Sequence, residues 1–547
     1  MPSSAEEASV GPLERGLAVV HALAGAPAGR LRRSDLVRAT GLARSTVDRI
    51  VTTLVRLGHL REEYGGDAVL TPRVLELGLA YLHASRLPEL LGPPAAALAD
   101  DLDESVSVAV PDRDAVRFVI QTPRRRALSV TFRAGDALPA ERCAPGALFA
   151  ADWDAPDFEH WHARALSDPD DETFPALPRS SAHQRSRPTQ EEFRALAKEA
   201  GKRGWALDDQ LIEPGLLAVA VPVRDGSRRV VCALSVASHS SRHSTASLYE
   251  RALEPMLRTA QQMTEALTTR EERPAAPVPA RDASLDPKRE LGPDYLQSLA
   301  RGLSVLAALS DPGGMTLSAV AQATALPRAT ARRSLLTLQS LGYVAETDRR
   351  FIPLPRVLEL GYSAVSARSL ADVAQPHLVD LVHRVLESAS VAVLDGPDIR
   401  YIARVAATRV MHVDITVGTR FPAHATSMGR VLLAALPSGQ RSAWLAEADL
   451  KPLTAHTLTD PVGLQGVLVD AERDGYAIVD QELEEGLRSI AVPLHGPDGK
   501  VVAALNIAHH AGRTPLSEVH ERLLPALRDT ARRIEDDVAL AFALRPS

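Results

Sequence analysis

Arginine and small hydroxyl side chains recur at matching places in two distant segments of this 547-residue chain. The two sets are Arg44, Ser45, Thr46 and Arg49, and then Arg328, Thr330, Arg332 and Arg333. Guanidinium groups bind phosphates and guanine edges, and hydroxyl groups bind phosphates or bases. Each set begins a stretch with helical spacing of apolar residues, so we predict two DNA-binding helices. The alternative is that these arginines form an ordinary solvated helix face.

A second group of polar residues surrounds the loop of residues 422–429, which runs into a predicted helix beginning at Ser427. Free N–H groups and the positive end of the helix dipole at such a place suit a carboxylate. The planar guanidinium of Arg420 or Arg430 would complete the site. Arg430 can instead pair with a carboxylate in the core, so the pattern predicts an anion site without deciding which arginine serves it.

The same loop is one glycine short of a serine-hydrolase motif. Residues 425–429 read Ala-Thr-Ser-Met-Gly, whereas the nucleophile elbow requires Gly-x-Ser-x-Gly, and no ordered acid and histidine partners are apparent. His509 and His510 are adjacent, so on a strand they point to opposite faces and do not easily share one metal. No phosphate-binding or dinucleotide-binding fingerprint is present. We therefore expect no enzymatic activity, no cofactor and no metal.

The composition is that of a globular protein, with 45% hydrophobic and 24% charged residues and a formal net charge of −7. This excludes a chain that is basic throughout, but residues 30–61 hold eight arginines against two aspartates, a local formal charge of +6. Cys143 and Cys232 cannot form a disulfide framework and are interpreted as small buried residues or, alternatively, as a single thiol switch. No secretion signal or transmembrane stretch is visible, so we expect a cytoplasmic protein with no membrane partner.

The chain repeats itself internally. Residues 72–78 recur as 355–361, residues 15–17 recur as 301–303, and the pair Gly135 and Pro139 recurs as Gly418 and Pro422. A repeat of this length is a duplicated multi-domain unit rather than a solenoid. The predicted domains are 11–72, 73–270, 295–355 and 356–540, with a Pro- and Ala-rich linker at 271–294 and a loop at 167–190.

The first domain of each copy has the element order of a winged helix-turn-helix. In the second copy we predict helices over 296–309, 319–323 and 328–341, the last ended by Gly342, and strands over 343–345 and 350–352. In the first copy the second helix contains residues 36–39, the third covers 44–57 and ends at Gly58, and a hairpin turns at 64–67. The start of the third helix would reach base edges.

The larger domain of each copy alternates helix and strand. In the second copy we predict helices over 374–388 and 427–436 and strands over 390–394, 399–405, 411–417, 489–494 and 500–508. These elements predict an α/β (α+β) domain with a mixed sheet and helices on its faces. Helices over 74–85 and 357–367 would link it to the DNA-binding domain.

Residues 324–333 and 341–344 resemble the DNA-binding domain of IclR-type transcription regulators, and residues 417–430 and 475–493 resemble that family's effector domain. Details such as Arg332-Arg333 and Asp480-Gln481-Glu482-Leu483 are most similar to the regulators of protocatechuate, β-ketoadipate and 4-hydroxybenzoate catabolism. The resemblance covers nearly all of both copies. It implies a winged helix-turn-helix, a linker helix and a GAF-like effector domain in each, acting on operator DNA as dimers or tetramers. Two copies in one polypeptide depart from the family, so the expected assembly is a homodimer or an intramolecular pseudo-dimer.

The resemblance also implies an effector pocket in the second copy. Its residues would be Arg420, His424, Ser427, Met428, Arg488, Ser489, Asn506 and Ala508, with less defined roles for Asp480 and Glu482. The first copy has Ala137, Glu141, Ala144, Ala147, Leu217 and Ala218 at the places of Arg420, His424, Ser427, Arg430, Arg488 and Ser489. Because so many donors are replaced, we expect the first effector domain to be a structural partner or to bind something more apolar.

Together these features predict a ligand-responsive transcription regulator of aromatic-acid catabolism genes in the β-ketoadipate pathway. Its partners would be double-stranded operator DNA and a small aromatic or dicarboxylic acid. The acid would shift the spacing of the two DNA-binding domains by binding one arrangement more tightly. The alternative is a small-molecule-binding or hydrolytic protein that does not bind DNA.

Overall fold

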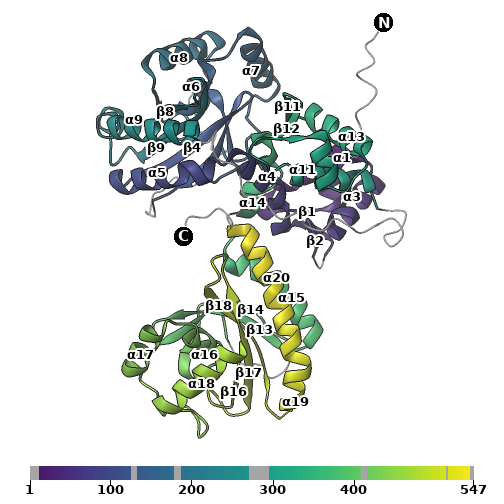
Figure 1. The fold of residues 1–547 in the computed structure, drawn as a ribbon, viewed down its shortest axis with the longest axis vertical. Helices are drawn as coiled ribbons and strands as arrows, with labels where there is room; N and C mark the ends of the chain where they lie inside the picture. The colour runs from purple at the N-terminus through teal and green to yellow at the C-terminus, as the bar shows by residue number, and fades with distance from the viewer. Residues whose placement is uncertain are drawn as a thin grey trace. The chain divides into compact units, whose positions relative to one another are not determined.

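The computed structural model describes residues 11–63, 65–124, 132–177, 187–269, 295–366, 368–407, 415–512 and 515–542. They form two compact units, the first within 11–366 and the second within 368–542, and each is described by itself. The first unit holds both helix-turn-helix domains and one sheet domain, and the second unit holds the other sheet domain (Figure 1). The predicted linker at 271–294 lies outside the described residues. In the described part of the chain, no helix is long and apolar enough to cross a membrane.

The first helix-turn-helix domain has the predicted element order and a wing sheet with strand order β1-β3-β2. Its elements are α1 (Pro12–Ala24), β1 (Arg30–Arg32), α2 (Arg33–Thr40), α3 (Arg44–Arg56), β2 (Leu60–Glu62) and β3 (Asp67–Leu70). Gly41 ends α2 with a φ of +66°, a left-handed conformation that glycine adopts without strain. Val47, Ile50 and Leu54 bury one face of α3, which leaves the other face to solvent. Tyr64, in the predicted hairpin tip, lies outside the described residues.

The second helix-turn-helix domain repeats this order, with strand order β10-β12-β11. Its elements are α11 (Gln297–Ala308), β10 (Met315–Thr316), α12 (Leu317–Ala323), α13 (Arg328–Ser340), β11 (Val344–Thr347) and β12 (Arg350–Pro353). Asp348 and Arg349 form the wing turn with φ values of +51° and +62°, as a two-residue hairpin loop requires. The predicted helices and strands of both domains are confirmed to within a few residues.

Helices α1 and α11 pack against each other through one contact that occurs twice. Leu299 of α11 covers Gly16 of α1, where an added Cβ would lie 2.3 Å from Leu299 Cδ1. Leu13 of α1 covers Gly302 of α11, where the corresponding distance would be 2.4 Å. Leu13 corresponds to Leu299 in the duplication, and Gly16 corresponds to Gly302. The contact is therefore isologous, as in a two-fold dimer, although both helices belong to one chain.

The two linkers differ from each other, which corrects one prediction. The first linker is helical as predicted, in α4 (Leu75–Ser85). The second is not a continuous helix over 357–367: a 3₁₀ helix, η5 (Pro355–Glu359), precedes the short α14 (Tyr362–Ser366), and Ala367 lies outside the described residues. Gly361 interrupts the helix with a φ of +104°, and an added Cβ there would lie 3.0 Å from Leu70. Close packing against the first helix-turn-helix domain thus breaks the second linker.

The first sheet domain is a six-stranded sheet in the order β6-β5-β4-β9-β8-β7, with every neighbouring pair antiparallel. Its elements are α5 (Leu87–Leu102), β4 (Ser105–Asp112), β5 (Ala115–Thr122), β6 (Ala137–Pro139), α6 (Ala144–Ala150), α7 (Ala155–Ser167), α8 (Gln190–Arg203), β7 (Ala206–Asp209), β8 (Leu216–Arg224), β9 (Val230–His239) and α9 (Thr245–Thr269). Helices α5 and α9 cover one face, and α6 and α8 lie on the other (Figure 1). The predicted loop at 167–190 contains no regular element in its described residues between α7 and α8.

The second sheet domain repeats this topology as β15-β14-β13-β18-β17-β16. Its elements are α15 (Leu370–Val385), β13 (Ser388–Asp395), β14 (Asp398–Val405), β15 (Arg420–Pro422), α16 (Ser427–Ala434), α17 (Ser438–Glu447), α18 (Pro461–Asp474), β16 (Ala477–Asp480), β17 (Leu487–His495), β18 (Val501–His510) and α20 (Leu524–Phe542).

Three predictions for this domain need correction. The sheet is antiparallel throughout rather than mixed, because two hairpins pair side by side and the α16–α18 segment carries the chain from one edge strand to the other. The helix expected over 374–388 starts earlier and ends before Leu386, whose φ is +58°. Of the strand expected over 411–417, residues 411–414 lie outside the described residues and 415–417 are not a strand.

Candidate nucleic-acid interface and effector site

Both recognition helices present the predicted residues on their solvent face. The exposed ones are Arg44, Ser45 and Arg49 in α3 and Arg328, Arg332 and Arg333 in α13, and Thr46 and Thr330 are half-buried. The opposite face of each helix is held in its domain by buried apolar residues such as Val47 and Leu335. In this motif the third helix enters the major groove, so the side chains are placed where a duplex can contact them.

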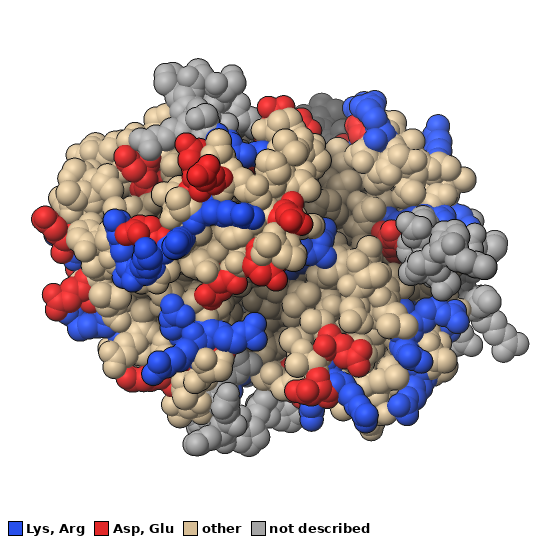
Figure 2. Space-filling model, turned by 90° about the horizontal axis from the view of Figure 1, so that it is seen from above, with Lys and Arg blue, Asp and Glu red and all other residues tan. Residues whose placement is uncertain are grey.

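The positive charge of the first copy is smaller than the predicted +6. Glu62, Glu63 and Asp67 lie just beyond the counted segment and neutralise part of it, while Asp35 and Asp48 within the segment form ion pairs as well. The observed pairs are Arg30–Glu63, Arg32–Asp67, Arg33–Asp48, Arg33–Glu62, Arg38–Asp35 and Arg61–Glu63. On the face drawn in Figure 2, basic and acidic side chains are likewise interspersed. Of the exposed arginines in α3, Arg44 at its start has no ion pair to any described residue, so it is a cation that a phosphate would meet.

In the second sheet domain, the structure brings Ser427 and Ser489 together. Thr426 caps α16 by accepting a hydrogen bond from the Gly429 N–H at 3.1 Å, and the Ser427 hydroxyl donates to the Ser489 hydroxyl at 2.8 Å. Ser489 lies opposite Ala508 in the sheet, so Asn506, two residues along β18, shares its face. Asn506 is 4% exposed, and its Oδ1 has no hydrogen-bond partner within the described residues. A buried amide with an unused oxygen is rare in folded proteins and marks a place where a ligand or a water can bind.

Two further predicted residues beside this place have structural partners, and Met428 packs in the core between α16 and the sheet. Arg430 donates to the Glu482 carboxylate at 2.5 Å and to the His424 carbonyl oxygen at 3.0 Å. The core pairing that was one alternative for Arg430 is therefore the one observed. His424 is buried, and its Nε2 lies 3.3 Å from the Lys451 carbonyl oxygen. Burial lowers the pKa of His424, so its imidazole is neutral at pH 7.

The structure does not bring Arg420 or Arg488 to the Ser427–Ser489 pair, contrary to prediction. Arg420 lies on the edge strand β15 and donates to the Asp395 carboxylate at 2.9 Å and to the Asp398 carboxylate at 3.2 Å. Arg488 precedes Ser489 in β17, so it points to the opposite face, where it donates to Asp480 at 2.8 Å.

Sequence reasoning placed His509 and His510 on opposite faces of a strand but did not predict that His509 is buried, on the same face as Arg488. His509 pairs in register with Arg488, is 3% exposed, and has no hydrogen-bond partner for either ring nitrogen within the described residues. Burial lowers its pKa from 6.5 to about 4. The strand position was a usable signal, because alternation buries only one residue of the His509-His510 pair. Among the described residues, no three His, Cys, Asp or Glu side chains are grouped so that they could hold a metal ion.

The first sheet domain fills the corresponding region with its own charges. Glu141, which stands at the place of His424, is 3% exposed and accepts hydrogen bonds from Trp161 Nε1 at 2.8 Å and Arg164 Nη2 at 2.9 Å. Arg164 also donates to Asp114 at 2.6 Å and to Asp171 at 3.1 Å. The remaining pairs are Arg142–Asp171, Arg187–Asp171 and Arg187–Glu141. Three arginines and three carboxylates thus pair with one another, although the buried Arg187 Nε makes no hydrogen bond within the described residues, so these arginines are already engaged inside the domain.

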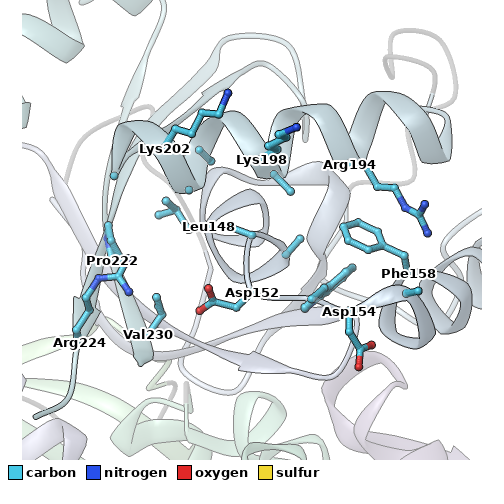
Figure 3. A pocket seen from close by; sticks show the side chains of 18 residues that line it. Leu148, Asp152, Asp154, Phe158, Arg194, Lys198, Lys202, Pro222, Arg224 and Val230 are labelled. Atoms are coloured by element: carbon cyan, nitrogen blue, oxygen red, sulfur yellow. The ribbon is translucent and has the colours of Figure 1, made fainter. Parts of the chain in front are cut away.

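A surface pocket of about 580 Å³ lies elsewhere in this domain, between α6, α7, α8 and β8 (Figure 3). Arg194, Lys198 and Lys202 project from α8 along its rim, and Asp152 lies on the facing wall (Figure 3). Arg194 stacks on the ring of Phe158 at 4.8 Å. None of the predicted site residues lines this pocket.

The hydrolytic and thiol-switch interpretations gain no support from the geometry. The Ser427 hydroxyl donates to another serine rather than to a histidine. Cys143 and Cys232 are both buried; burial raises the pKa of the Cys143 thiol and raises that of Cys232 to about 12. Protonated, inaccessible thiols react slowly, which favours the interpretation as small buried residues.

The chain matches two protein-family descriptions, each of them twice. "Bacterial transcriptional regulator IclR C-terminal" matches residues 79–265 and 362–536, and "IclR helix-turn-helix domain" matches residues 12–63 and 298–348. The Pca regulon regulatory protein of Pseudomonas putida is 42% identical over 274 residues, which cover 47% of this chain and 94% of that protein. Two Acinetobacter baylyi proteins are each 34% identical over a match that covers 44% of this chain. The match covers 89% of the Pca operon regulatory protein and 92% of the p-hydroxybenzoate hydroxylase transcriptional activator.

Proposed function

The chain belongs to the IclR family of bacterial transcription regulators, and we propose that one polypeptide supplies both DNA-binding domains to a single operator. The reciprocal contact of Leu13 with Gly302 and of Leu299 with Gly16 carries this proposal. It joins the two helix-turn-helix domains in the manner of a two-fold dimer, which supports an intramolecular pseudo-dimer. Two recognition helices held in this way contact successive half-sites of one duplex.

The second effector domain binds the ligand in this proposal. Ser427, Ser489 and Asn506 gather polar atoms between α16 and the sheet, and the oxygen of Asn506 has no partner among the described residues. The names of the three relatives refer to Pca regulation and to p-hydroxybenzoate hydroxylase, so the proposed ligand class is a small aromatic or dicarboxylic acid of the β-ketoadipate pathway. The acid changes DNA affinity by preferring one arrangement of the domains.

The first effector domain acts as a structural partner. Its buried carboxylates Glu141 and Asp171 already engage the arginines that an anionic ligand would need. The protein works in the cytoplasm without a cofactor and has no enzymatic activity in this proposal. The competing function, a small-molecule-binding or hydrolytic protein, predicts no retention of DNA.

A gel shift with the full chain and the region upstream of its own operon separates these functions. We expect a retained complex whose affinity falls steeply with salt. Arg44→Ala and Arg328→Ala should each weaken binding by about 5- to 150-fold, the cost of a lost base contact or phosphate contact. Arg258→Ala is the matched control, because Arg258 is exposed on α9 of the first effector domain, away from both recognition helices. Failure to retain any fragment at low salt supports the competing function.

Calorimetry with protocatechuate, 4-hydroxybenzoate and β-ketoadipate tests the ligand class. We expect Ser489→Ala to weaken binding of the best ligand, because it removes one of two paired hydroxyl groups. Ser442→Ala, an exposed serine on α17, serves as the control. Binding of the same acid to residues 70–270 alone would contradict the structural role of the first effector domain.

A further inference from the structure

The two recognition helices, α3 and α13, occupy the same position in their domains but differ in some of their exposed residues. Their matching residues are Arg44 with Arg328, Thr46 with Thr330, and Arg49 with Arg333. Their differing residues at solvent-accessible positions include Ser45 against Ala329 and Asp48 against Arg332. The same turn of helix therefore presents a hydroxyl and a carboxylate in the first domain, and a methyl and a guanidinium in the second.

The carboxylate of Asp48 is fixed by its neighbours. Arg33 from α2 donates to Asp48 at 2.7 Å and to Glu62 of the wing strand β2 at 2.9 Å, which ties together three elements of the first domain. The corresponding residues of the second domain are Leu317, Arg332 and Glu346. Leu317 cannot form this bridge, and Arg332 is exposed with no ion pair to any described residue. The second helix thus offers an extra cation at the place where the first offers a neutralised pair.

The surroundings of the two domains differ as well. The first effector domain contacts the second linker and the second helix-turn-helix domain: Arg117 lies 3.6 Å from Glu359 of η5, and Arg113 covers Gly342 at the end of α13. Glu359 also accepts a hydrogen bond from the Tyr343 hydroxyl at 2.8 Å. These contacts make the surroundings of the second helix-turn-helix domain different from those of the first.

We propose that the operator is a composite of two dissimilar half-sites in a fixed order, one for α3 and one for α13, rather than a palindrome. This inference rests on the proposed function. A homodimer binds a palindrome because its two recognition helices are identical. Here a serine hydroxyl can bond a base or a phosphate where Ala329 contacts only a thymine methyl, and the Arg332 guanidinium can bind guanine where Asp48 cannot.

The test starts with selection of binding sequences from a random duplex library by the full chain. The selected site is then compared with two palindromes, each built from one of its halves. We expect the composite to bind at least about tenfold more tightly than either palindrome, since single mismatched base pairs already cost about 5- to 150-fold. Selection of a palindrome, or equal binding of all three duplexes, overturns the composite operator and leaves DNA binding intact. No enrichment of any sequence and no retention of DNA overturns the proposed function as well.

Substitution of two exposed residues shows which half-site each recognition helix contacts. Ser45→Ala should relax the base preference in one half-site only, and Arg332→Ala should do so in the other half-site only. Arg258→Ala should change neither half. If either variant alters both halves equally, the two helices read the same sequence and the proposal is wrong. Unchanged circular dichroism identifies variants that remain folded.

Discussion

The contact between α1 and α11 can be broken by adding atoms at one glycine. In Gly16→Val, the first added carbon would lie 2.3 Å from Leu299 Cδ1, whereas carbon atoms pack best at about 3.5–4.0 Å. Leu299 is fully buried, so it has little room to move aside. Gly302→Val places the same strain on Leu13 at the mirrored position, where the distance would be 2.4 Å.

The expected cost follows from two opposing effects. Overpacking a filled core costs about 1–3 kcal/mol. Replacing glycine by valine inside a helix returns roughly 0.4 kcal/mol of helix propensity. The contact between the helices should therefore weaken by about 0.6–2.6 kcal/mol, which corresponds to an increase of roughly 3- to 80-fold in local opening. Gly92→Val in α5 is the control, because nothing lies within 4 Å of its added Cβ.

Hydrogen exchange followed by mass spectrometry measures this opening directly. Gly16→Val should accelerate exchange in α11 as well as in its own helix, and Gly302→Val should accelerate exchange in α1. Gly92→Val should leave both helices as protected as in the unaltered chain. If Gly16→Val changes only α1, or changes nothing, the two helices do not support each other and the pseudo-dimer is refuted.

Three other perturbations have defined outcomes. Glu141→Gln should lower the free energy of unfolding of the first effector domain by about 3–5 kcal/mol, measured with denaturant, because it breaks a buried ion network. Glu254→Gln, which changes an exposed ion pair, is the control and should have little effect. Burial lowers the pKa of His509 to about 4, so the neutral side chain contributes fully to stability above pH 6.5, and this contribution is lost as the pH falls towards 4. Thermal unfolding of the parent chain and of His509→Gln should therefore differ by an amount that changes with pH over this range. A difference that stays constant with pH would contradict the burial. Burial raises the pKa of Glu359, but the charges of Arg356, His21 and Arg117 outweigh it and lower the pKa below 4.5. Glu359→Gln should therefore lower the free energy of unfolding above pH 4.5 and have a smaller effect in acid. Denaturant unfolding of both proteins at pH 7 and at pH 3 measures this difference.

Local signals were enough to predict the helix-turn-helix domains. Gly342 marks the end of α13, and the apolar spacing of residues 296–309 locates α11 to within one residue. These features depend on neighbours in sequence, where capping and periodicity operate. The second linker could not be predicted in this way, because Gly361 leaves the helix to pack against Leu70, a contact made across the fold.

The candidate site was predictable only in part for a similar reason. Ser427 and Ser489 were correctly grouped, but Arg488 was assigned to the same site although alternation along β17 turns it away. The charge of the first copy was overestimated because some of its balancing acids lie beyond the counted segment. The Glu141 network could not be predicted, since Asp114 and Asp171 reach it from separate segments whose proximity only the fold determines.

The number of chains on one operator tests the central claim most directly. Native mass spectrometry of the full chain with its selected duplex at low salt should show one chain per duplex, with both half-sites protected in a footprint of the same sample. A complex containing two chains on that duplex, protection of a single half-site, or no complex at all would contradict the claim that one polypeptide presents both recognition helices.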